Sequence, residues 1–202
     1  MPESSRPRAA ATAARRLVIA SLKEDHKRVR RAFRDFDKLD ARADADQMHA
    51  LVTRTLAQLE LHAALEAEIV YPATREAAAA REAVEEAEVA HASMQALVDQ
   101  LKAAGPDDAK YVARFRVLGE YVALHADDEE AALFPRLERA GVAWEELSAR
   151  LAARRAELAR EHRLELDPVA ATMSGEASAP PGKPRAARPR RAAAPRRTAR
   201  AR

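Results

Sequence analysis

The sequence predicts an all-α fold: an up-down-up-down antiparallel four-helix bundle with a shorter fifth helix and a disordered basic C-terminal tail. Three observations lead to this prediction. Hydrophobic residues make up 48% of the chain but aromatic residues only 4%, which is typical of Ala- and Leu-rich helices. Four long stretches carry apolar residues at helical spacing. Short links separate these stretches, and helices joined in this way pack most simply as an antiparallel bundle.

The first two helices are expected at residues 14–40 and 45–71. The first follows a polar, Ala-rich N-terminus, residues 1–13, which we expect to be disordered. Both helices place their apolar residues on one stripe, as an amphipathic helix does. Pro72 disturbs the backbone after the second helix, because proline has no N–H to donate.

The remaining helices are expected at residues 81–103, 108–134 and 144–162. Gly105 suits the C-terminal cap of the third helix. Gly119 lies in the middle of the fourth, where glycine costs about 1 kcal/mol relative to alanine. A close approach of a neighbouring helix is one reason for a glycine there. The fifth helix is amphipathic and is expected to lie against the bundle.

The chain is expected to divide into the bundle at residues 14–140, an accessory segment with the fifth helix at 141–166, and the tail at 167–202. Six of the 11 prolines fall in the tail, and it has no apolar periodicity with which to bury a core. Residues 183–202 hold nine Lys or Arg and no acid, whereas residues 1–182 carry a net charge of −6. Positive charge without interleaved aromatics favours non-specific, salt-sensitive binding of nucleic acid. A merely solubilising tail is the alternative.

Composition also excludes several kinds of site. The chain has no cysteine, so disulfides, thiolate metal sites and cysteine nucleophiles are excluded. Any metal must therefore be bound by imidazole and carboxylate. No apolar run approaches the roughly 20 residues that span a bilayer, and the longest near the N-terminus, LVIASL, is too short for a signal peptide. We therefore expect a cytoplasmic protein without membrane contact.

Two stretches of the chain repeat one pattern, LHAALEAEIVYP and LHADDEEAALFP. Each has a His, a Glu four residues later, an aromatic residue nine after the His, and then Pro. Positions i and i+4 of a helix share one face. His62 with Glu66, and His125 with Glu129, should therefore point together toward the bundle axis.

Two further histidines, His26 and His91, fall on the inward stripes of the first and third helices. His49 points away from the stripe of the second helix, and His162 lies at the end of the fifth. A buried polar group without a partner costs about 1–3 kcal/mol, so four inward histidines favour a metal site. Direct hydrogen bonds between His and Glu are the alternative.

Four imidazoles and two carboxylates are more than one tetrahedral ion needs, and they suit a pair of metal ions bridged by carboxylates. The predicted metal ligands are His26, His62, Glu66, His91, His125 and Glu129. Ligation by nitrogen and oxygen without sulfur fits iron, manganese or zinc. With two bridging carboxylates, at least one coordination position is left open for dioxygen, nitric oxide or peroxide.

These motifs resemble the hemerythrin-like domain, also called the HHE cation-binding domain, over about residues 17–140. The resemblance rests on EDHKRVRRAF, HAALEAEIVYP, EVAHASMQALVDQL and HADDEEAALFP. It implies a centre of two non-haem iron ions, in which the four histidines are terminal ligands and Glu66 and Glu129 bridge the irons.

The sequence also departs from the oxygen-carrying hemerythrins. Those proteins place two histidines four residues apart on the third helix, whereas here Ala87 and Gln95 flank His91 at that spacing. They also use an Asp where this chain has Glu130. One fewer imidazole disfavours reversible oxygen carriage and favours sensing, scavenging or slow redox chemistry. Glu130 is the alternative to Glu129 as a ligand, and the internal repeat favours Glu129.

Three functions remain open from the sequence: a module that binds or senses dioxygen, nitric oxide or iron; an enzyme that removes peroxide or nitric oxide; and a metal-free helical scaffold with a nucleic-acid-binding tail.

A ferritin-like di-iron fold is the rival architecture. It needs Glu-x-x-His on two helices, and only Glu88 with His91 supplies this motif. Tyr71 and Tyr121 lie near the expected site and are assigned to ordinary packing.

Overall fold

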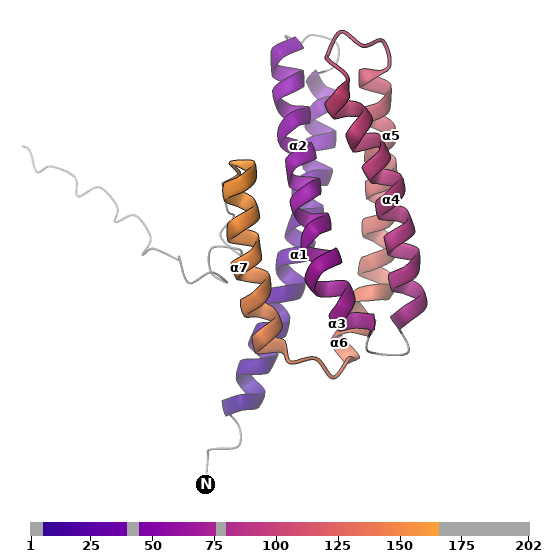
Figure 1. Ribbon diagram of the computed structural model, residues 1–202. Helices are drawn as coiled ribbons and strands as arrows, with labels where there is room; N and C mark the ends of the chain where they lie inside the picture. The colour runs from indigo at the N-terminus through magenta and orange to yellow at the C-terminus, as the bar shows by residue number, and fades with distance from the viewer. Residues whose placement is uncertain (1–5, 40–44, 76–79, 166–202) are drawn as a thin grey trace, which may run out of the picture.

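The computed structural model describes residues 6–39, 45–75 and 80–165. Within them all regular structure is helical (Figure 1), which confirms the predicted fold class. The long helices of the bundle are α1 (Arg6–Leu39), α2 (Ala45–Leu65), α4 (Arg81–Ala103) and α5 (Tyr111–Asp128). The other helices are α3 (Tyr71–Arg75), α6 (Phe134–Arg139) and α7 (Trp144–His162).

The four long helices run alternately up and down, and α7 lies beside α1 and α2 (Figure 1). Their buried apolar residues form two separate clusters along the bundle. One cluster includes Leu22 and Leu65 and extends to α7, and the other includes Phe36 and Phe115. Between the two clusters, each long helix contributes buried or half-buried polar side chains. The core is therefore interrupted by a polar layer, and the site lies there.

Gly119 marks a close approach between α1 and α5. A Cβ atom at this position would lie 2.9 Å from Cδ1 of the Phe33 ring, which is inside van der Waals contact. The contact explains a glycine in the middle of a helix and agrees with the close approach expected from the sequence.

The start of α1 differs from the expectation. We expected residues 1–13 to be disordered, but α1 begins at Arg6. Alanine is the best helix former, and Ala11 and Ala14 pack against the apolar cluster that α7 completes. The contact with α7, which the sequence pattern of α1 does not reveal, accounts for the longer helix.

The predicted tail lies outside the described residues, so its disorder and its binding of nucleic acid stay predictions. In the described part of the chain, no helix is both long enough and apolar enough to cross a membrane.

Both repeated motifs contain a π-helical turn, at Glu66–Val70 and at Glu129–Leu133. Each turn begins at the Glu of the motif, and a backbone hydrogen bond across five residues closes it, from Tyr71 N–H to Glu66 O in the first motif. Pro72 was expected to disturb the backbone, and α3 nevertheless continues the second helix through it to Arg75. We attribute this to the wider turn before the proline, which accommodates the missing N–H. Such turns occur frequently at functional sites.

Candidate metal centre

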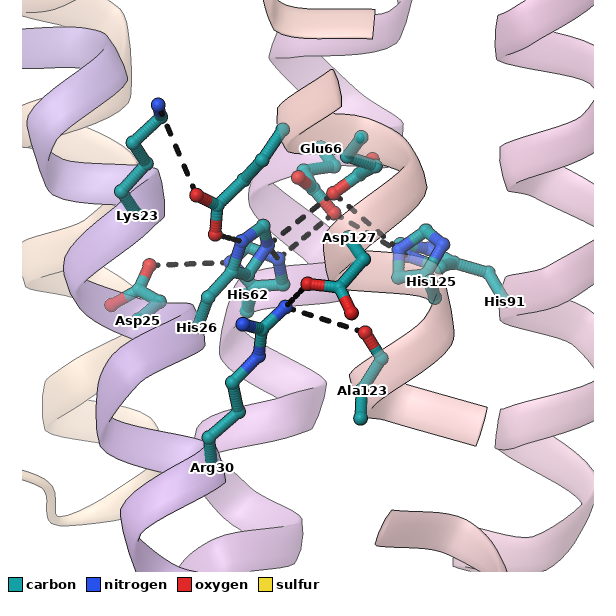
Figure 2. Close-up of polar contacts among 12 residues, drawn as sticks. Lys23, Asp25, His26, Arg30, His62, Glu66, His91, Ala123, His125 and Asp127 are labelled. Carbon is teal, nitrogen blue, oxygen red and sulfur yellow. Dashed lines mark hydrogen bonds and ion pairs between the residues drawn. The ribbon is translucent and has the colours of Figure 1, made fainter. Parts of the chain in front are cut away.

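The six side chains predicted as ligands meet in the polar layer (Figure 2). They form two groups, and in each group one potential ligand atom per residue lies within 4.8 Å of the others. The first group is His26, His62, Glu66 and Glu129, and the second is Glu66, His91, His125 and Glu129. The two carboxylates belong to both groups. This is the arrangement in which carboxylates can bridge two metal ions.

The first pair of histidines is arranged to face a cation. His26 Nε2 lies 3.1 Å from His62 Nε2. Nδ1 of His26 lies 2.9 Å from Glu130 Oε1, and Nδ1 of His62 lies 3.3 Å from Asp25 Oδ2. An ionised carboxylate only accepts hydrogen bonds, so both Nδ1 atoms carry the hydrogen and both Nε2 atoms present lone pairs to each other. The pair therefore needs either an added proton or a metal ion between the two rings.

An added proton meets this need when no metal is bound. Burial alone would lower the pKa of His62, but Glu66 and Asp25 raise it well above the ordinary value of histidine. A metal ion would replace this proton, because imidazole binds metals in its neutral form.

The second pair of histidines includes a ring that is held in the neutral form, His125. His91 Nε2 and His125 Nε2 lie 2.8 Å apart. Burial lowers the pKa of His125 to about 3; Glu66 opposes this shift, while the other histidines reinforce it. At neutral pH the His125 ring is therefore uncharged and can donate a lone pair to a metal ion.

The two carboxylates are buried and incompletely satisfied. Glu66 Oε1 and Glu129 Oε2 have no hydrogen-bond partner among the described residues. Burial would raise the pKa of Glu66, but His62 and His91 hold it well below its usual range. Burial and the charge of Glu66 raise the pKa of Glu129. Two buried carboxylates that each have an oxygen without a hydrogen-bond partner lie beside four imidazoles. This arrangement fits a cationic centre, because a bound cation would be the partner of each unpaired oxygen.

Tyr71 is a member of the site that the sequence assigned only to packing. Its hydroxyl donates to Glu129 Oε1 over 2.8 Å and lies 3.4 Å from Glu66 Oε2 and 3.2 Å from His91 Nε2. Burial and the two carboxylates raise its pKa, so the hydroxyl stays protonated. Its repeated position nine residues after a motif His was the available signal. Tyr121, in contrast, is 47% exposed.

Glu129 and Glu130 have different surroundings. Glu129 is buried and belongs to both groups. Glu130 is half-buried, and it contacts His26 Nδ1 and, at 3.8 Å, Lys23 Nζ. Gln95, one of the two residues that lie four positions from His91, is exposed and donates to Asp99. It therefore does not complete the ligand set.

A small cavity of about 30 Å³ adjoins all four histidines. Its other walls are mainly apolar and include Val29, Met94, Val98 and Val122. A water molecule needs about 10–15 Å³ of such space, so the cavity admits one or two small molecules. A diatomic ligand could therefore lie directly beside the imidazoles.

Comparisons with known proteins agree with this geometry. The crystal structure of a Hemerythrin HHE cation binding domain-containing protein from Mycobacterium kansasii is similar in fold, with a TM-score of 0.57 and 20% sequence identity. The alignment covers 76% of this chain and 96% of that one. A search of curated proteins gave no match. The family model of the Hemerythrin HHE cation binding domain matches residues 17–137, and the chain therefore belongs to this family.

Proposed function

We propose that this protein binds two non-haem iron ions in the polar layer of its bundle. The observation that carries the proposal is the pair of buried groups that share Glu66 and Glu129. His26 and His62 would hold one ion, and His91 and His125 the other. Nitrogen and oxygen ligands suit iron, and manganese and zinc accept the same donors.

The bound ligand we propose is a small molecule, dioxygen or nitric oxide, and the role is binding or sensing. Iron would supply the redox chemistry and the affinity for such ligands. The chain contributes a mainly apolar pocket: Met94 and Val98 line the cavity beside the histidines. Because neither Ala87 nor Gln95 is a histidine, fewer imidazoles are available than in oxygen carriers, and a coordination position stays open.

Removal of peroxide or nitric oxide by the same centre is the second candidate. The Tyr71 hydroxyl favours it, because a protonated donor 2.8 Å from Glu129 Oε1 can offer a hydrogen bond to a small ligand at the centre. Turnover of peroxide by iron-loaded protein would support the enzyme. A reversible spectral change without turnover would support the sensor.

Elemental analysis with an optical spectrum of freshly purified protein tests the proposal. We expect about two metal ions per chain, mainly iron, and an absorption spectrum that changes on exposure to nitric oxide. Protein that remains metal-free after purification and after anaerobic addition of ferrous iron would contradict it. That result would instead favour the metal-free scaffold.

A further inference from the structure

The fifth helix contributes a buried arginine next to the metal centre. Arg155, on α7, is 1% exposed. It is the only lysine or arginine of the described segments that is buried. Its Nη1 and Nη2 donate to Oδ1 and Oδ2 of Asp25 over 2.9 and 2.6 Å. This two-pronged pair joins α7 to α1 and fixes the plane of the carboxylate.

Asp25 in turn holds one of the histidines. Its Oδ2 accepts from Nδ1 of His62, and Nε2 of that ring points at the metal site (Figure 2). Burial would raise the pKa of Asp25, but Arg155 and His62 hold it at about 2, so the carboxylate stays an acceptor. A continuous chain of contacts therefore runs from α7 through α1 to a ligand on α2.

The two proposed metal positions differ in whether a carboxylate contacts Nδ1 of their histidines. His26 and His62 both have a carboxylate at Nδ1. Neither His91 nor His125 has a hydrogen-bond partner at Nδ1 among the described residues. A carboxylate behind a metal-bound histidine fixes the ring and makes it more basic, and its loss typically costs 10–100-fold in metal affinity.

We propose that Arg155 is a positioning residue that acts through Asp25 and His62, and that the metal position of His26 and His62 is consequently the tighter of the two. This inference rests on the proposed metal centre. Residues 17–137 match the family, so the arginine comes from a helix outside the matched domain. The accessory helix is thus part of the metal site.

The test compares Arg155→Met with Arg154→Met. Arg154 is adjacent on α7 but pairs at the surface with Glu68 and Glu157. Metal release to a chelator is followed over time in the full chain loaded with two ions. We expect two phases in the wild type and in Arg154→Met. In Arg155→Met the slow phase should become 10–100-fold faster and the fast phase should not change.

A double variant separates positioning from simple stabilisation. Arg155→Met leaves the Asp25 charge buried without its partner, which is itself destabilising. Asp25→Asn/Arg155→Met removes both charges and should recover the melting temperature of the metal-free protein, while metal release from the slow phase stays fast. Recovery of slow release together with stability would overturn the proposal, because the pair would then act only on folding.

The outcomes also separate this inference from the proposed function. If the wild-type chain binds no metal, the proposed function is wrong. A wild-type chain that binds two ions, with the same slow release in Arg155→Met, overturns only the role of Arg155.

Discussion

Tyr71 and Phe134 occupy the same place in the two repeated motifs, and each packs against a histidine from a helix outside its own motif. The Tyr71 ring lies 5.5 Å from the ring of His91, and the Phe134 ring stacks on His26 at 5.7 Å with an angle of 9° between the planes. The halves of the bundle are therefore similar in shape. Only Tyr71 adds a hydroxyl, so the two ends of the centre differ in chemistry.

Tyr71→Phe should keep both metal ions, because the protonated hydroxyl is a hydrogen-bond donor and not one of the six ligands. Loss of the bond to Glu129 should cost about 0.5–1.5 kcal/mol of stability. It should also change the reactivity of the iron-loaded protein toward peroxide. Elemental analysis, thermal melts and peroxide assays measure the three effects. Tyr121→Phe, at an exposed position, is the control, and loss of metal from Tyr71→Phe would show that the hydroxyl is a ligand.

His62→Ala and His125→Ala should each abolish binding of at least one metal ion, because each removes a nitrogen from a different group. His49→Ala is the matched control: His49 lies on the exposed side of α2, 3.0 Å from the Tyr111 hydroxyl and outside both groups. Metal content per chain is the readout. Equal loss from the control would disprove the assignment of ligands.

Removal of the metal should lower the melting temperature, because binding free energy at a buried site contributes to folding. At a free metal concentration 100 times the dissociation constant, the contribution is about 2.7 kcal/mol. Melting curves before and after chelation, and after metal is restored, measure it. Identical curves would mean that the buried groups do not bind metal.

Acid should destabilise the metal-free protein through Asp25. Its pKa is about 2 in the folded chain against an ordinary value of 3.8. The folded pKa is the lower one, so the stabilisation is complete above about pH 4 and is lost as the pH falls toward 2. At about 1.36 kcal/mol per pKa unit, the stabilisation by the Asp25 carboxylate amounts to about 2 kcal/mol. Denaturant unfolding between pH 2 and 5 should show this loss in the wild type and a smaller one in Asp25→Asn/Arg155→Met.

The clustering of the six predicted ligand side chains could be predicted because it follows local periodicity. A helix places positions i and i+4 on one face, so the motifs alone put His62 beside Glu66 and His125 beside Glu129. His26 and His91 interrupt the apolar stripes of their helices. Their inward direction could be predicted once the rotational phase of each helix was correct. The bounds of α4 and α7 follow similarly from periodicity and from breakers such as Gly105.

The support of the ligands could not be predicted so directly. Arg155 falls between Leu151 and Leu158 on the apolar stripe of α7, which was a signal, but its partner Asp25 is 130 residues away and only the packing of α7 brings them together. The π-helical turns depend on a balance of backbone hydrogen bonds before Pro72 and Pro135. Hydrophobic periodicity does not predict such a turn, and the turn at Glu66–Val70 directly precedes Tyr71. The position of the Tyr71 hydroxyl was therefore missed.

Anomalous diffraction at the iron absorption edge, from crystals of protein purified with iron, tests the central claim most directly. The account predicts two peaks in the polar layer, one between His26 and His62 and the other between His91 and His125, both beside Glu66 and Glu129. No peak in this layer, or peaks only at the surface of the bundle, would contradict it.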